Sequence, residues 1–97
     1  MTSGNAKKIL KREKCLWREE AEGSLIKVFA PGMPAGVIEV RGGQVLKMSH
    51  YGLFYPATAR GLENLIGDMG AGSAEDGLRA QHGAAMAEHF KREWPSP

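Results

Sequence analysis

The stretch that decides the fold is Val37–Ser49, VIEVRGGQVLKMS, which predicts a β-hairpin. Two runs rich in β-branched residues flank Gly42-Gly43, and glycine tolerates the positive φ that tight hairpin loops require. A three-residue loop, Gly42-Gly43-Gln44, separates apolar from polar residues best, because a slip of one residue reverses the faces. The resulting cross-strand pairs are Val40 with Leu46, Ile38 with Met48, Arg41 with Val45, Glu39 with Lys47 and Val37 with Ser49. The sheet is therefore expected to have one buried face and one solvent-exposed face.

Amphipathic segments surround this hairpin. Residues 5–21 have helical periodicity with Ser3 or Asn5 as the cap, and residues 24–30 are expected to form a first strand. Residues 58–69 predict a second helix that Thr58 caps and Gly70 ends, and residues 73–94 predict a third. The expected fold class is α+β in the order α-β-β-β-α-α. About three antiparallel strands pack against an N-terminal helix and two C-terminal helices.

Size and composition indicate one small domain over residues 1–97, with 1–4 and 95–97 expected to fray. Hydrophobic residues make up 42% and charged residues 25%, which is typical of soluble globular proteins. The single Cys15 excludes an intramolecular disulfide and fits a reducing compartment. No apolar leader opens the sequence, and no apolar run approaches the ~20 residues that span a bilayer. A cytoplasmic protein without membrane contact is predicted.

Positive charge is concentrated at the N-terminal end of the chain. Residues 1–18 carry six basic residues and one acidic residue, a balance of +5, within a net charge of +2. On a helix, these cations would form a surface that meets nucleic-acid phosphates or an acidic protein patch. The alternative is a solvated helix face, since Lys and Arg are good helix formers. The candidate partner-binding residues here are Lys7, Lys11, Arg12, Lys14 and Arg18.

The segment His50–Pro56, HYGLFYP, is rich in aromatic residues and bounded by glycine and proline. Tyr51, Phe54 and Tyr55 are candidate partner-binding residues, because aromatic side chains offer large contact areas and, in tyrosine, a hydrogen-bonding end. The alternative interpretation is that they close the small core or form a last short strand.

The predicted third helix carries one face of small residues that would allow another element to approach closely. This face either packs in the middle of the fold or joins two subunits of a homodimer, which would enlarge the thin core of a short chain. The residues assigned to this candidate oligomer interface are Gly77, Ala80, Gly83, Ala84 and Ala87.

The sequence shows no catalytic, metal or cofactor signature. Cys15 lies among basic residues that would lower its thiol pKa, but no histidine is nearby in sequence, so an unreactive cysteine is the favoured interpretation. His82 and His89 are seven residues apart, about 10.5 Å along a helix, which is too far for one metal ion. The glycine-rich residues 67–72 follow a helix, whereas a phosphate loop follows a strand. No metal, no cofactor and no enzyme activity are predicted.

Two functions of different classes are consistent with these features. The first is a small non-enzymatic protein-binding module, such as a regulator, adaptor or inhibitor that acts on a larger assembly. The second is a nucleic-acid-binding protein that uses the basic N-terminal helix.

Overall fold

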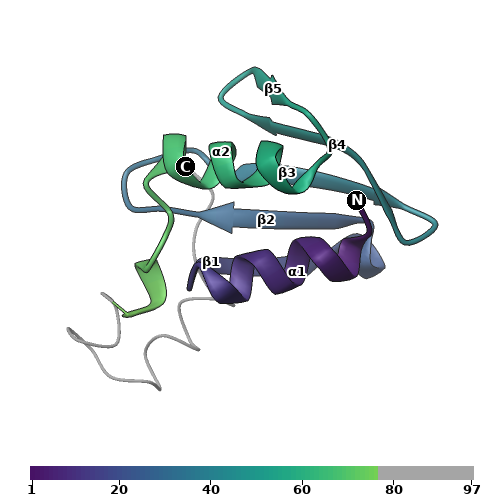
Figure 1. Ribbon diagram of the computed structural model, residues 1–97. Helices are drawn as coiled ribbons and strands as arrows, with labels where there is room; N and C mark the ends of the chain where they lie inside the picture. Colours follow the sequence, from purple (N-terminus) through teal and green to yellow (C-terminus); the bar gives the residue numbers. More distant parts are fainter. Residues whose placement is uncertain (77–97) are drawn as a thin grey trace.

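The computed structural model describes residues 1–76, which form an antiparallel sheet with two α-helices on one face (Figure 1). The chain runs through α1, the five strands and then α2, and the strands lie side by side in sequence order. The α+β class is confirmed, and the described residues contain five strands where three were predicted. The elements are α1 (Ser3–Arg12), β1 (Leu16–Glu20), the 3-10 turn η1 (Ala21–Gly23), β2 (Leu25–Phe29), β3 (Gly36–Arg41), β4 (Gln44–His50), β5 (Leu53–Tyr55) and α2 (Ala59–Met69).

The core lies between the helices and one face of the sheet. Alternate residues of the strands point to this face, and the apolar sides of α1 and α2 cover them. A smaller cluster on the opposite face joins Leu16 and Phe29, against which Ala74 packs. The buried residues of the main core include Ala6, Ile9, Leu10, Ile26, Val28, Ile38, Val45, Met48, Leu62, Leu65, Ile66 and Met69.

The predicted N-terminal helix over residues 5–21 is wrong in its second half. The helix ends at Arg12, Lys14 turns the chain with a φ of 55°, and Leu16–Glu20 forms the edge strand β1. Leu16 pairs with Phe29 and Trp17 with Val28, so these two side chains lie on opposite faces of the sheet. Pairing with β2 overrides the helical preference of these residues, because helix propensity is weak compared with burial in a sheet.

The β3–β4 hairpin has the predicted register from Val37 to Glu39, but its turn differs from the predicted one. Val37 pairs with Ser49, Ile38 with Met48 and Glu39 with Lys47, as expected. The loop, however, has two residues, Gly42 and Gly43, with φ of 58° and 76°. A register shift next to Glu39 leaves Leu46 as an extra residue on β4. Because of this bulge, the hairpin can have a two-residue loop and still direct its apolar residues to the buried face. A regular ladder with the same loop would mix polar and apolar residues on both faces.

Helix α2 has the predicted caps. The Thr58 hydroxyl accepts a hydrogen bond from Gly61 N at 3.0 Å, and Gly70 ends the helix with a φ of 65°. Gly61 is buried directly against the main chain of Pro56, the residue that follows β5. The start of α2 is thereby fixed to the end of β5.

The described chain ends on the loop that joins α1 to β1. Ser73 N donates to Glu13 O at 2.6 Å, and Glu75 N donates to Lys14 O at 3.0 Å. Helical residues begin at Ala74, one position after the predicted cap Ser73, whose own φ is 62°. The rest of the predicted third helix lies outside the described residues, as do its candidate interface residues Gly77, Ala80, Gly83, Ala84 and Ala87 and the histidines His82 and His89.

At the other end of the chain, Thr2 forms a β-bridge with Gln44, and Ser3 N donates to Gly43 O at 2.9 Å. The fraying expected for residues 1–4 stays a prediction. Within residues 1–76, none of the helices combines the length and apolar character that a membrane span requires.

Candidate functional site

The β4–β5 hairpin forms the edge of the sheet opposite β1 (Figure 1) and turns through the two-residue loop Tyr51-Gly52. Both loop residues have positive φ, 55° for Tyr51 and 79° for Gly52. Two-residue hairpin loops need this conformation, but a side chain with a Cβ adopts it at some energetic cost. The loop therefore holds a large aromatic side chain at the tip of the sheet.

Three side chains of this hairpin are largely exposed, and we call them the hairpin patch: Tyr51 is 75% exposed, Leu53 62% and Phe54 67%. Leu53 pairs with His50 and Phe54 with Ser49, so Leu53 and Phe54 point to opposite faces of the sheet. The patch therefore lies around the edge of β5 that pairs with no other described strand, instead of covering one face. Exposed apolar side chains that lie together are typical of contact surfaces, whereas single ones are common everywhere.

The ring of Phe54 is oriented by a cation. Lys47 Nζ lies 4.8 Å from the ring centroid, and the same nitrogen is 3.8 Å from Glu39 Oε2. A cation over an aromatic ring contributes about 0.5–1 kcal/mol at an exposed site. Phe54 is thus presented on the face of the sheet opposite α1 and α2.

Tyr55 has a different role from the two aromatic residues predicted beside it. Its hydroxyl donates to Asp68 Oδ2 of α2 at 2.6 Å, and this hydrogen bond raises the pKa of Tyr55. Tyr55 also packs against the main core. It joins β5 to α2, so its hydroxyl is already used within the fold.

The predicted basic surface is divided in the structure. Lys7 forms an ion pair with Glu19, and Arg12 donates to Glu63 Oε2 at 2.8 Å. These acidic partners lie on β1 and α2, far from their cations in sequence. The pairs use charge that an external anion would otherwise meet, although each exposed pair adds little to stability.

Lys14 and Arg18 leave the helix altogether. Lys14 Nζ lies 3.0 Å from Asp76 Oδ2, and Arg18 is in β1, where its Nε lies 2.6 Å from Glu20 Oε2. The hydrogen bond from Arg18, together with Lys27, lowers the pKa of Glu20. Lys8 and Lys11 are the basic residues of 1–18 that form no ion pair within the described chain. The basic surface predicted for a single N-terminal helix does not form, because these cations are divided between α1, the turn after it and β1.

Cys15 is buried, with no exposed surface. Burial raises the pKa of its thiol to about 12, and the nearby carboxylate of Glu13 acts in the same direction. The expectation that its basic neighbours lower this pKa is wrong, because desolvation of the thiolate is the largest effect and raises it. Cys15 is a core residue, in agreement with the favoured interpretation.

His50 is the buried polar residue of the hairpin and is 6% exposed. Its Nε2 is buried and has no hydrogen-bond partner within residues 1–76, an arrangement that costs about 1–3 kcal/mol. We therefore expect His50→Leu to leave the free energy of unfolding unchanged or to raise it by about 1 kcal/mol, since leucine has no polar atom to satisfy. Urea denaturation followed by circular dichroism measures this. A loss above about 1 kcal/mol would show that Nε2 has a stabilising partner.

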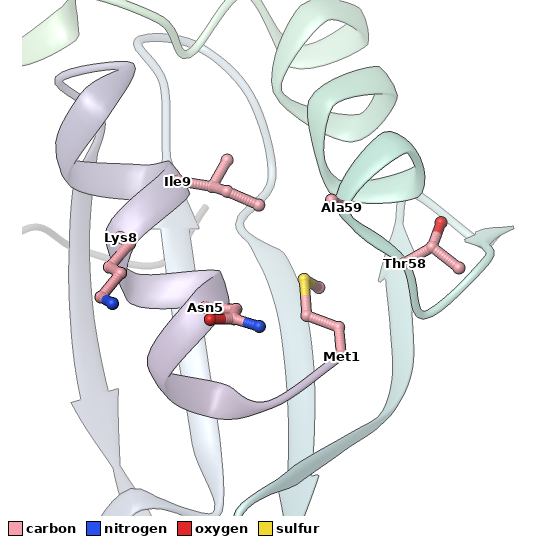
Figure 2. A pocket seen from close by; sticks show the side chains of 6 residues that line it. All are labelled: Met1, Asn5, Lys8, Ile9, Thr58 and Ala59. Atoms are coloured by element: carbon pink, nitrogen blue, oxygen red, sulfur yellow. The ribbon is translucent and has the colours of Figure 1, made fainter.

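A hollow of about 460 Å³ lies between the starts of α1 and α2, lined by Met1, Asn5, Lys8, Ile9, Thr58 and Ala59. Figure 2 shows Met1 and Ile9 between the two helices, whereas Lys8 points away from α2. The Thr58 hydroxyl is already used as the helix cap. Of the polar lining residues, Asn5 points between the helices (Figure 2), and one such group is fewer than ligand sites normally bring together.

Metal-ligating side chains do not gather in the described part of the chain: no group of three or more His, Cys, Asp or Glu residues there could hold an ion. Sequence reasoning found Tyr51 and Phe54 but missed Leu53 of the hairpin patch. Leu53 lies on the same face of the sheet as Tyr55 and is exposed because β5 is an edge strand, a position that the sequence alone does not reveal.

No protein-family model, no curated protein and no solved structure matches this chain.

Proposed function

We propose that this chain is a small non-enzymatic protein-binding module whose contact surface is the hairpin patch. The observation that carries the proposal is the composition of the β4–β5 hairpin and its flanks. Residues 48–59 contain no Asp, Glu, Lys or Arg, yet Tyr51, Leu53 and Phe54 are mostly exposed. Contact surfaces of proteins are enriched in aromatic residues and depleted of charge at their centres.

The edge position of β5 supports the same proposal. An edge strand presents unpaired main-chain groups, and natural proteins usually protect such an edge with charged side chains. The opposite edge, β1, carries Arg18, Glu19 and Glu20, whereas β5 carries none. An edge without charge is suited to binding another polypeptide, in the role of a regulator, adaptor or inhibitor.

A variant series in an affinity capture from the native host tests the proposal. The variants Tyr51→Ala and Phe54→Ser are expected to reduce the amount of the retained proteins at least about tenfold, because they remove exposed anchor side chains. The double variant Lys8→Ala/Lys11→Ala is the matched control on α1 and should retain them fully. Quantitative mass spectrometry of the eluates provides the measurement. Equal retention by the wild type and the hairpin variants would refute the proposal.

The alternative, nucleic-acid binding, would now rest on Lys8 and Lys11. Fluorescence anisotropy with generic DNA and RNA at ~50 and ~200 mM salt separates the two functions, because phosphate contacts make affinity steeply salt-dependent. We expect no appreciable binding at either salt concentration. Tight binding at ~50 mM that is lost in the Lys8→Ala/Lys11→Ala variant would favour the alternative.

A further inference from the structure

We propose that the partner of the hairpin patch is a second copy of this chain, joined edge to edge through β5 across a two-fold axis at Phe54. The inference rests on the proposed function of the hairpin as a contact surface and names its occupant. Two five-stranded sheets would then form one continuous antiparallel sheet, with the α-helices of both copies on the same side.

The main chain of β5 offers one residue for such pairing. In a hairpin with a two-residue loop, the residues that close the loop, His50 and Leu53, face each other, and main-chain direction alternates along the strand. The N–H and C=O of Phe54 therefore point away from β4. No main-chain hydrogen bond of Phe54 outside the strand ladder occurs among the described residues.

The next outward position of β5 is closed. Pro56 has no N–H, and its carbonyl oxygen accepts from Thr58 N at 2.8 Å. An extended peptide of several residues would lack partners beyond Phe54. Two copies related by a two-fold axis need only this residue, because Phe54 of each copy donates to and accepts from the other as one antiparallel pair.

Charge favours a second copy over a charged partner. A two-fold axis brings each residue near it close to its own copy, so any charge there meets a like charge. Residues 48–59 carry none. Lys47, which lies over the Phe54 ring, forms an ion pair with Glu39 at 3.8 Å. This edge can therefore pair with its own copy without bringing like charges together, as an isologous contact requires.

The side chains of the hairpin patch supply the area. Across the axis, Phe54 would lie opposite Phe54 of the other copy, and aromatic cross-strand pairs are favourable. The exposed parts of Tyr51, Leu53 and Phe54, with the surrounding main chain, amount to roughly 500 Å² per copy and roughly 1,000 Å² in total. This is near the lower limit for a specific interface, so a dimer with a micromolar dissociation constant is expected.

Charge substitution at the axis tests the inference. Multi-angle light scattering and sedimentation velocity should give twice the 10.5 kDa chain mass at high concentration and the chain mass on dilution. Phe54→Asp and Phe54→Lys should each raise the dimer dissociation constant more than about tenfold, because like charges would meet at the axis. An equimolar mixture of the two variants should regain the dimer. Asn64→Asp, an exposed charge on α2, is the control and should dimerise like the wild type.

Three results would overturn the inference. The first is a wild-type chain that stays monomeric at every concentration. The second is a dimer that persists in both variants, which would point to the predicted face of Gly77–Ala87. The third is a pair of variants that are monomeric alone and do not dimerise when mixed. Circular dichroism confirms that both variants fold. In each of these cases, the affinity capture with Phe54→Ser separately decides whether the hairpin binds another protein.

Discussion

Gly61→Ala is expected to destabilise the fold by about 3 kcal/mol, since inserting a group into a close main-chain contact forces the backbone apart. A Cβ at this position would lie 1.9 Å from Pro56 O and 2.9 Å from Pro56 C. These are backbone atoms, and the Pro56 carbonyl is held by Thr58 N, so neither can rotate away as a side chain would. The change would separate the start of α2 from the end of β5 and disturb the base of the hairpin.

Gly67→Ala is the matched control on the same helix. No atom lies within 4 Å of a Cβ built there, and its backbone is helical. Alanine should therefore stabilise the protein by about 0.5–1 kcal/mol through its higher helix propensity. Urea denaturation of both variants, followed by circular dichroism, gives the two values. Similar values for Gly61→Ala and Gly67→Ala would contradict the close contact between α2 and Pro56.

The thiol of Cys15 is expected to react with iodoacetamide about a thousandfold more slowly in the folded protein than in the unfolded chain at pH 8. The thiolate is the reactive form, and a rise in thiol pKa from 9.0 to about 12 lowers its fraction by about that factor. Steric burial slows the reaction further, because Cys15 has no exposed surface. Mass spectrometry of timed samples, with and without urea, measures the two rates.

The same shift has a consequence for stability at high pH. The folded-state pKa of Cys15 is raised, so the folded state retains a proton that the unfolded chain loses above pH 9.0. The contribution of the Cys15 thiol to the free energy of unfolding is therefore fully present below pH 9.0, and it is lost as the pH rises toward about 12. Rapid alkylation of the native protein at pH 8 would show instead that the basic neighbours control the thiol.

The elements that follow from local chemistry were predictable from the sequence. Pairing of Ile38 with Met48 and Glu39 with Lys47 follows from the alternation of apolar residues, and helix α2 follows from its periodicity and from Thr58 and Gly70. The exposed aromatic residues Tyr51 and Phe54 were also identified, although the short strand that presents Phe54 was left open as one alternative.

What depends on distant parts of the chain was not predictable. Leu16–Glu20 has good helix formers and becomes a strand because it pairs with β2. The basic segment looked unpaired because the partners of Lys7, Arg12 and Lys14 come from elements beyond the segment itself. The bulge at Leu46 was not predicted either. It depends both on the turn at Gly42-Gly43 and on the pairing of Ile38 with Met48, which lie at opposite ends of the hairpin.

Two copies of this chain are expected to associate through the β4–β5 hairpin and not through the basic residues of α1. An ¹⁵N-resolved NMR spectrum, recorded on dilution from about 200 µM to about 10 µM across the expected micromolar range, tests it most directly. We expect concentration-dependent shifts that centre on Tyr51–Tyr55, with faster amide exchange of Phe54 at the lower concentration. Spectra that do not change, or changes that centre on Lys8 and Lys11, would contradict it.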